Sequence, residues 1–229
     1  MRAAVVVFPA SNCDQDVARA LETVTGTPPV MVWHGDSSLP DVDLIVLPGG
    51  FSYGDYLRCG AMAAKTAVMR DVVRRAETGT HVLGICNGFQ ILLETGILPG
   101  AMLQNANLKF VCRDVHLKLE RTNTPFTHTY KDDAVLRIPV AHHEGNYFAT
   151  DDTLAALEDG DQIVFRYTDE NANATDQANP NGSRNNIAGI TNTQGNVLGL
   201  MPHPERAVDP LHGGVDGLPM FQSLLETLS

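Results

Sequence analysis

Short apolar segments in the first half of the chain alternate with longer segments that carry apolar residues at helical spacing. The apolar segments predict buried strands at residues 3–8, Val30–Trp33, Leu44–Leu47 and His81–Ile85. Between them, residues 14–24 and roughly 60–77 predict helices. Wholly apolar strands must be covered on both faces, and right-handed crossovers place the helices there. We therefore predict an α/β fold with a doubly wound, mainly parallel sheet flanked by helices.

The second half of the chain predicts a small antiparallel addition to this sheet. Residues 108–138 contain shorter stretches of alternating polarity, and Ile187–Thr191 with Val197–Leu200 predicts a closing hairpin. Residues 169–186 are polar and rich in turn formers, so they predict a surface loop. A chain of 229 residues has room for one sizeable core, and we expect residues 1–229 to form a single domain.

The composition excludes several classes of protein. Hydrophobic residues make up 43% and charged residues 19%, as is typical of globular chains. The net charge of −11 and the lack of a Lys/Arg run argue against nucleic-acid binding. No stretch of about 20 apolar residues predicts a membrane span, and the apolar start is too short for a signal peptide. The four cysteines are widely spaced, so we expect free thiols in a cytoplasmic protein rather than disulfides or a zinc ribbon.

The segment Gly84-Ile85-Cys86-Asn87-Gly88 is the first candidate for chemistry. It follows an apolar strand and precedes residues at helical spacing, so it predicts a sharp strand-to-helix turn with the cysteine at its tip. Flanking glycines make such a strained turn possible, and the helix directs its amides toward the sulfur, where they could stabilise an oxyanion. A buried structural cysteine at a tight turn is the alternative, and this segment alone leaves both open.

A second segment, His203-Pro204-Glu205, supplies the partners that a cysteine nucleophile needs. The imidazole could carry the proton of the thiol, and the carboxylate could orient the imidazole. With Pro204 holding the backbone extended, we expect His203 and Glu205 to project on the same side. Taken alone, the segment fits a surface His and Glu beside two prolines better. Together with the cysteine turn, it favours catalysis.

These two segments resemble the class I, or triad, glutamine amidotransferases. Residues 48–58 and 201–207 are similar to signatures of the glutaminase of phosphoribosylformylglycinamidine synthase, and residues 181–189 add to the likeness. The resemblance covers nearly the whole chain and implies a flavodoxin-like fold. It implies Cys86 as the nucleophile, His203 as the general base and acid, and Glu205 as the orienting carboxylate.

The same resemblance implies the groups that surround the nucleophile. Gly50 and Asn87 would contribute backbone amides to an oxyanion hole. The glutamine substrate would be held by Gln90, Asn105, Asn107 and Phe110.

One segment departs from the family pattern, which usually reads Ala-His-Gly-Glu-Gly where this chain has residues 141–145. His143 stands at the usual glycine, so the geometry of this loop is open. A metal site at His142, His143 and Glu144 is the alternative interpretation. Adjacent residues of an extended segment point in opposite directions and the spacing fits no common zinc motif, so we expect no metal.

The resemblance implies hydrolysis of L-glutamine through a thioester and transfer of ammonia to a synthetase that uses ATP to convert formylglycinamide ribonucleotide into formylglycinamidine ribonucleotide. The chain has no phosphate-binding Gly-x-x-x-x-Gly-Lys-Ser/Thr loop, so ATP and Mg²⁺ are expected on a partner. Expected partners are the large synthetase subunit and a small bridging third subunit. We expect hydrolysis to be weak until the partner docks.

Three alternatives remain from the sequence. Another cysteine hydrolase on a similar fold would usually take its histidine from elsewhere than a His-Pro-Glu segment. A glutaminase that serves a different synthetase would lack the Gly-Phe-Ser-Tyr-Gly-Asp-Tyr segment at residues 50–56. A binding module that has lost the chemistry would lack a triad member, and none is missing here.

Overall fold

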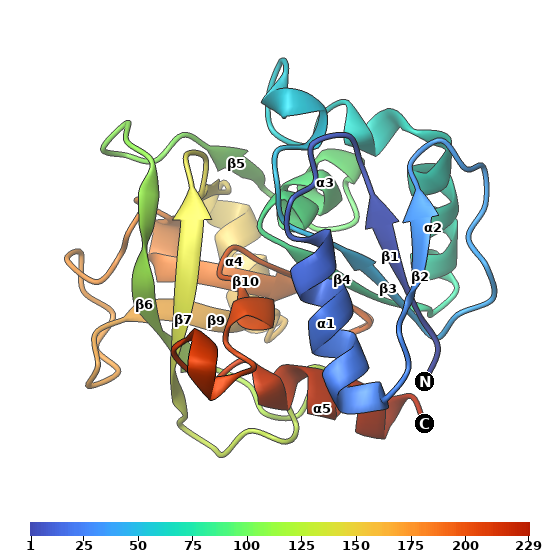
Figure 1. The fold of residues 1–229 in the computed structure, drawn as a ribbon. Coiled ribbons are helices and arrows are strands. Elements are labelled where there is room, and N and C mark those ends of the chain that lie inside the picture. The colour runs from blue at the N-terminus through green and yellow to red at the C-terminus, as the bar shows by residue number, and fades with distance from the viewer.

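Nine strands form one mixed sheet in the computed structural model, which describes residues 1–229 (Figure 1). Its first half is parallel and contains, in spatial order, β2 (Val30–Trp33), β1 (Ala3–Val7), β3 (Leu44–Leu47), β4 (His81–Ile85) and β11 (Val197–Leu200). The chain adds β2 on one side of β1 and then β3 and β4 on its other side, as in doubly wound folds. The loops after β1 and β3 therefore lie side by side at the carboxyl edge of the sheet.

The other half of the sheet is antiparallel. It continues from β11 through β10 (Ile187–Thr191), β9 (Ile163–Thr168), β6 (Val111–Leu119) and β7 (Val135–His142). The strands β5 (Ala101–Leu103) and β8 (Asn146–Phe148) form a separate antiparallel pair. The predicted fold class is confirmed, and so is the closing hairpin formed by β10 and β11.

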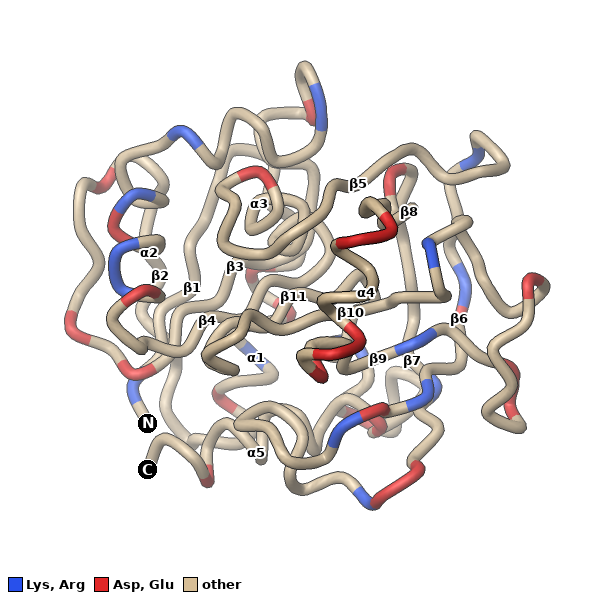
Figure 2. Tube along the Cα trace, turned by 180° about the vertical axis from the view of Figure 1, so that it is seen from behind, with Lys and Arg blue, Asp and Glu red and all other residues tan.

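Helices cover both faces of the sheet (Figures 1 and 2). On one face lie α1 (Asp14–Thr25) and α5 (Leu218–Thr227), which contact each other. On the other face lie α2 (Ala67–Glu77), α3 (Asn87–Thr95) and α4 (Asp151–Asp159). Five single turns of 3-10 helix complete the structure: η1 (Ser52–Asp55), η2 (Ala63–Lys65), η3 (Arg184–Asn186), η4 (Pro204–Arg206) and η5 (Pro210–His212).

The second predicted helix begins later than expected, at Ala67 rather than near residue 60. Thr66 caps it, because the Thr66 side chain accepts a hydrogen bond from the Met69 amide. Gly60 has a φ of 78°, and a Cβ there would lie 2.8 Å from the amide nitrogen of Ile91. The chain therefore turns tightly against α3 at Gly60 before the helix can start.

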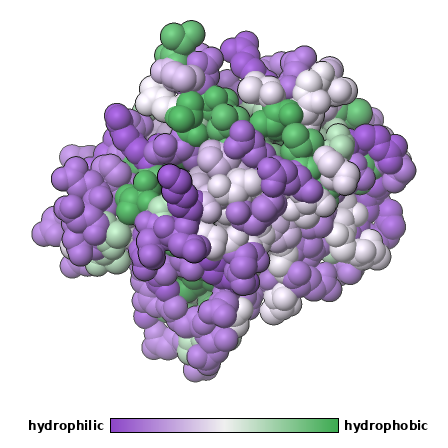
Figure 3. Space-filling view, turned by 90° about the horizontal axis from the view of Figure 1, so that it is seen from below, coloured by the Kyte–Doolittle hydropathy of each residue, from purple (hydrophilic) through white to green (hydrophobic).

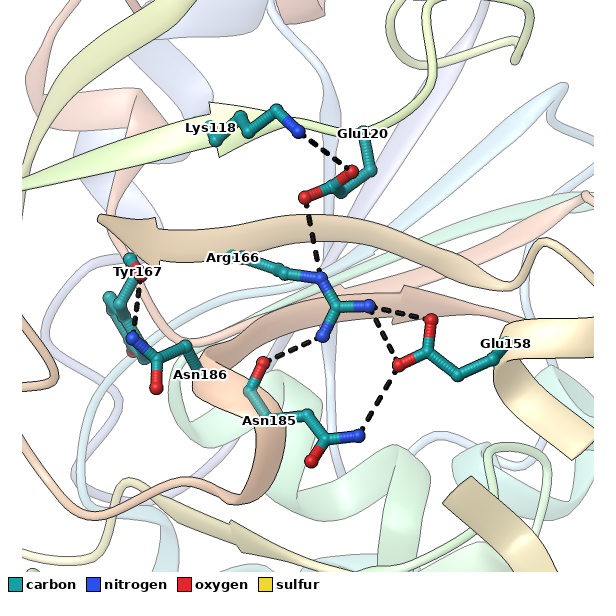
Figure 4. A network of polar contacts seen from close by, with 7 residues as sticks. All are labelled: Lys118, Glu120, Glu158, Arg166, Tyr167, Asn185 and Asn186. Atoms are coloured by element: carbon teal, nitrogen blue, oxygen red, sulfur yellow. Dashed lines mark hydrogen bonds and ion pairs between the residues drawn. The ribbon is translucent and has the colours of Figure 1, made fainter. Parts of the chain in front are cut away.

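One core of 57 buried hydrophobic residues runs through both halves of the sheet. At the antiparallel end, an ion-pair network joins β6, β9, α4 and η3 around the Arg166 side chain (Figure 4). Arg166 contacts Glu158 at 2.7 Å and Glu120 at 3.3 Å, and it donates to the Asn185 carbonyl at 2.7 Å. Because Arg166 is largely buried between these partners, the network fixes the loop before β10 to the sheet.

Lys and Arg positions are interspersed with Asp and Glu positions along the chain (Figure 2), and the net charge is −11. Seen from below, the molecule is mostly hydrophilic with scattered apolar patches (Figure 3). None of the helices has the length and hydropathy that a bilayer crossing requires.

Candidate active site

Cys86 lies at the turn between β4 and α3, in the strained conformation that the sequence predicts. Its φ is 50° and its ψ is −104°, and its amide donates to the Leu200 carbonyl at 2.8 Å. A Cβ at Gly84 would lie 2.8 Å from the Gly88 carbonyl carbon, and one at Gly88 would collide with the Leu47 carbonyl. Only glycine fits at either position, so the two glycines bring α3 close to β3 and β4 and hold the cysteine at the tip.

His203 and Glu205 lie together after β11, next to this turn. His203 Nδ1 and Glu205 Oε1 are 2.7 Å apart, and the residues are 2% and 3% exposed. The prediction of an extended backbone was wrong, because residues 204–206 form the 3-10 turn η4. The two side chains nevertheless meet, since the His203 amide is fixed to the Pro139 carbonyl at 2.9 Å and Gly49 leaves room for the ring.

The electrostatic surroundings of His203 favour its protonated form. Burial lowers the pKa of His203, but the Glu205 carboxylate and the Cys86 sulfur outweigh burial and raise this pKa well above its usual value. His203 Nε2 is buried without a hydrogen-bond partner, so it is free for a proton that is exchanged with Cys86 or a substrate. The Cys86 thiol itself donates to the Ala141 carbonyl at 3.8 Å, and the imidazole and carboxylate beside it are paired as nucleophilic catalysis would require.

Two backbone amides beside Cys86 are free to bind an oxyanion. Neither the Gly50 amide nor the Asn87 amide donates a hydrogen bond within the chain. Gly50 has a φ of 142°, and a Cβ there would lie 2.8 Å from the Asn12 amide nitrogen, so the position requires glycine. The Asn87 side chain accepts a hydrogen bond from the Ser52 amide at 3.2 Å, which connects the loop after β3 to the start of α3.

The residues expected to hold glutamine fall into two groups. Gln90 and Asn105 are buried, and their side chains bond to the segment that connects β7 and β8: Gln90 Nε2 donates to the Glu144 carbonyl at 2.6 Å, and Asn105 Oδ1 accepts from the Gly145 amide at 3.0 Å. Asn107 and Phe110 are exposed on the neighbouring loop. Gln90 and Asn105 thus hold the wall of the site in place, whereas the side chains of Asn107 and Phe110 are exposed.

The departure at residue 143 is accommodated without backbone strain. His143 is not among the residues with positive φ, and its side chain is exposed. His142 instead is buried, and its Nδ1 lies 3.1 Å from Asn105 Oδ1. Burial and the nearby His203 lower the pKa of His142 to about 4. These two side chains do not converge with Glu144 on a metal position.

Sequence reasoning missed two residues that lie against His203. Cys13, at the start of α1, has its sulfur within 4.8 Å of a His203 ring nitrogen and a Glu205 carboxylate oxygen. Arg206 donates from Nη2 to this sulfur at 3.1 Å. The position of Cys13 could have been predicted, because it follows β1, and the loops after β1 and β3 must meet at the carboxyl edge of a parallel sheet. Ser11 and Gly50 form a bridge between these two loops.

The fold and the site together define a class of protein. Residues 1–215 match the model of the CobB/CobQ-like glutamine amidotransferase domain. The chain therefore belongs to the glutamine amidotransferase family.

Within that family, two similar relatives share one name. The chain is 56% identical to phosphoribosylformylglycinamidine synthase subunit PurQ of Zymomonas mobilis over 230 residues, covering 100% of both chains. It is 54% identical to the subunit of the same name from Rhodospirillum rubrum, again covering 100% of both.

Solved structures of glutamine amidotransferases share this fold. A chain in the structure of PurLQS from Thermotoga maritima matches with a TM-score of 0.88 and 48% identity, covering 100% of this chain and 99% of that one. The glutaminase domain of Trypanosoma brucei CTPS with bound acivicin matches with a TM-score of 0.63 and 12% identity, covering 100% and 95%, and this likeness concerns the fold alone.

Proposed function

We propose that this chain is the glutaminase subunit of a phosphoribosylformylglycinamidine synthase. It hydrolyses L-glutamine to glutamate and ammonia for the ATP-dependent formation of formylglycinamidine ribonucleotide in purine biosynthesis. Relatives that are 52–56% identical over the full chain carry this function in their name. The observation that supports the chemistry most directly is the strained Cys86 beside the buried His203–Glu205 pair.

The proposed reaction begins when the Cys86 thiolate attacks the carboxamide carbon of glutamine. The carbonyl oxygen becomes an oxyanion, which the free amides of Gly50 and Asn87 are placed to bind. His203, held protonated by its surroundings, gives its proton to the departing nitrogen, and ammonia leaves a glutamyl thioester on Cys86. His203 then removes a proton from water, which attacks the thioester; glutamate leaves, and the Cys86 thiolate and protonated His203 are restored. Glu205 keeps the imidazole oriented throughout.

Substrate binding is assigned to the residues around the segment between β7 and β8. Gln90 and Asn105 hold this segment in place, and Asn107 and Phe110 offer exposed side chains that can close over the amino-acid end of glutamine. No cofactor is assigned to this chain. ATP and Mg²⁺ are proposed to bind the synthetase subunit, because the chain has no phosphate-binding loop.

The proposed partners are the large synthetase subunit and a small third subunit that bridges the two. The likeness to a chain of PurLQS from Thermotoga maritima supports this assembly. The continuous core supports residues 1–229 as one amidotransferase domain, and the four free cysteines are consistent with a cytoplasmic location. Because Cys86 is only 4% exposed, glutamine reaches it after neighbouring loops shift, which gives a docking partner a means of control.

The test is glutamate release from glutamine by the wild type and by Cys86→Ala, each with and without the synthetase subunit. We expect the wild type to be slow alone and at least about tenfold faster with the synthetase, because docking completes the site. Cys86→Ala should lose essentially all activity under both conditions. Cys112→Ala changes an exposed cysteine on β6 and serves as the matched control, with activity like that of the wild type.

Each outcome separates the alternatives. Activity that needs Cys86 but ignores this synthetase would point to a glutaminase for another synthetase. Activity retained by Cys86→Ala would remove Cys86 from the mechanism, and no activity in any assembly would favour a binding module.

A further inference from the structure

The most unusual feature around the proposed triad is a third group against the imidazole. Cys13 is 2% exposed, and its sulfur, a His203 ring nitrogen and a Glu205 oxygen all lie within 4.8 Å of one another. The Cys13 amide donates to the Gly49 carbonyl at 3.3 Å, and a Cβ on Gly49 would lie 2.7 Å from His203 Cε1 and 3.1 Å from the Cys13 sulfur. The sulfur and the imidazole therefore share one tightly packed space beneath the loop that contains Gly50.

The sulfur is held there by a defined set of contacts. The Cys13 thiol donates to Asn12 Oδ1 at 3.2 Å, and the sulfur accepts from Arg206 Nη2 at 3.1 Å. Arg206 Nε in turn donates to Asp16 Oδ2 at 3.1 Å, so the guanidinium is anchored to α1. This places a fixed positive group against the sulfur.

These three groups could in principle ligate a metal, since a thiol, an imidazole and a carboxylate are ordinary zinc ligands. The guanidinium of Arg206 argues against it, because a cation bonded to the sulfur would be repelled by a positive charge only 3.1 Å from that atom. The same guanidinium suits a polarised sulfur that acts on the imidazole.

We propose that Cys13 and Arg206 are positioning residues for glutamine hydrolysis: the Cys13 sulfur holds the imidazole of His203 between Glu205 and Cys86 and stabilises its protonated form, and Arg206 fixes that sulfur in place. The inference rests on the proposed role of His203. Cys13 touches neither the substrate nor the reacting atoms, so it acts through His203. The Cys13 sulfur is also one of the groups that raise the pKa of His203 against the effect of burial.

The titratable and charged groups that surround His203 come from several elements. They are Cys13 from the start of α1, Cys86 from the start of α3, His142 from β7, and Glu205 and Arg206 from η4. Only Cys13 and Arg206 in this set have no role in the proposed triad or in the wall of the site. Replacing Cys13 or Arg206 should therefore alter the imidazole of His203 while leaving Cys86 and Glu205 in place.

The test compares Cys13→Ala, Cys13→Ser and Arg206→Gln in the complex with the synthetase subunit. We expect Cys13→Ala and Arg206→Gln to lower kcat by roughly tenfold or more with little change in KM, because a misplaced imidazole slows proton transfer rather than binding. In Cys13→Ala, the alkaline limb of the pH profile of kcat/KM should move about half a unit or more to lower pH, because a group that stabilises protonated His203 is lost. Cys13→Ser should stay close to the wild type, since a hydroxyl can donate to Asn12 and accept from Arg206.

Two controls and a second readout make the outcomes distinct. Cys112→Ser alters an exposed cysteine and Arg19→Gln an exposed arginine of α1, and both should behave like the wild type. The rate of Cys86 alkylation by iodoacetamide at about pH 6, followed by peptide mass spectrometry, reports the thiolate–imidazolium pair without any need for glutamine. We expect this rate to fall severalfold in Cys13→Ala and Arg206→Gln.

An unchanged pH limb in Cys13→Ala, together with an unchanged alkylation rate in both Cys13→Ala and Arg206→Gln, would overturn the inference even if kcat falls, because a purely structural role would lower kcat alone. If Cys13→Ala does not fold, the alkylation rate decides: a rate that is unchanged in Arg206→Gln would overturn the inference, as would a rate that falls equally in Arg206→Gln and Cys13→Ser. Altered alkylation in a protein that releases no glutamate would support the positioning role while contradicting the proposed function.

Discussion

His142 illustrates how a buried polar residue serves the site through its surroundings. Its ring is enclosed between β7 and the loops that follow β5 and β9: Nδ1 lies 3.1 Å from Asn105 Oδ1, and Nε2 lies 3.4 Å from Asn181 Nδ2. Both contacts suit a neutral ring that donates from Nδ1 and accepts at Nε2. A Cβ on Gly145 would press against this ring, so His142 also sets the position of the segment that contacts Gln90.

This environment predicts a pH-dependent stability. Because burial and His203 lower the pKa of His142 to about 4, the unfolded chain binds a proton at His142 between about pH 6.5 and 4 that the folded protein does not. Stability is therefore complete above about pH 6.5 and falls as the pH drops toward 4, by about 2 kcal/mol at pH 5 from this residue. Urea unfolding at about pH 7.5 and about pH 5 should show a smaller loss for His142→Gln than for the wild type. His143→Gln, on an exposed neighbour, should lose as much as the wild type, and equal losses in all three proteins would contradict the prediction.

At the scale of elements, α2 shows how one buried carboxylate can anchor a crossover. Asp71 accepts a hydrogen bond from the Leu39 amide at 2.9 Å and pairs with Arg74 and Arg75 of the same helix. Arg75 also donates to the Pro40 carbonyl at 2.8 Å. The loop between β2 and β3 is thereby fixed to α2, with Asp71 as the shared acceptor.

Asp71→Asn should destabilise the protein. Burial raises the pKa of Asp71, but the Leu39 amide and the two arginines outweigh burial and lower it, so the charged form contributes stability above the usual Asp range. Replacing the carboxylate removes the negative charge that Arg74 and Arg75 share, and we expect the free energy of unfolding at neutral pH to fall by about 1–3 kcal/mol. Glu77→Gln, exposed on the same helix, should change it by less than about 0.5 kcal/mol. Denaturant titration of both variants measures the difference, and similar values for the two would show that Asp71 is not an anchor.

At the scale of the whole molecule, exposed apolar side chains gather on two loops near the site. The loop between β3 and α2 carries Tyr56 and Leu57, and the loop between β5 and β6 carries Leu108 and Phe110. Both loops lie at the upper end of the molecule in Figure 1, away from the termini. The first loop is fixed by Arg58, whose guanidinium contacts Glu94 at 2.6 Å. Exposed apolar groups beside the candidate active site are suited to docking of a partner.

Leu57→Ser should therefore weaken binding of the synthetase subunit. Leu57 is 82% exposed, so its replacement costs the folded chain little, whereas an interface would lose buried apolar surface. We expect the dissociation constant to rise about tenfold. Leu211→Ser is the matched control, because Leu211 is 91% exposed on η5 in a different part of the surface. Calorimetric titration of each variant with the synthetase measures the effect. An affinity for Leu57→Ser equal to that of the control would exclude this loop from the interface.

The sequence by itself determined the parallel half of the sheet and the cysteine turn. Apolar segments such as Leu44–Leu47 are typical of strands that are buried on both faces, and glycines such as Gly84 and Gly88 are needed where a strand turns directly into a closely packed helix. These properties are local, so they can be recognised without knowledge of distant neighbours. The pairing of His203 with Glu205 was likewise predictable from their separation by one residue, although the backbone between them was not.

Only the tertiary structure decided which distant groups surround His203. Cys13 and Arg206 are far apart in sequence, and their contact arises because the loops after β1 and β11 end at the same edge of one sheet. The tertiary structure likewise buries His142, which lowers its pKa, and leaves the adjacent His143 exposed. The physical reason is that pairing, desolvation and charge coupling depend on the distance between side chains, which strand order sets and local residue preference does not.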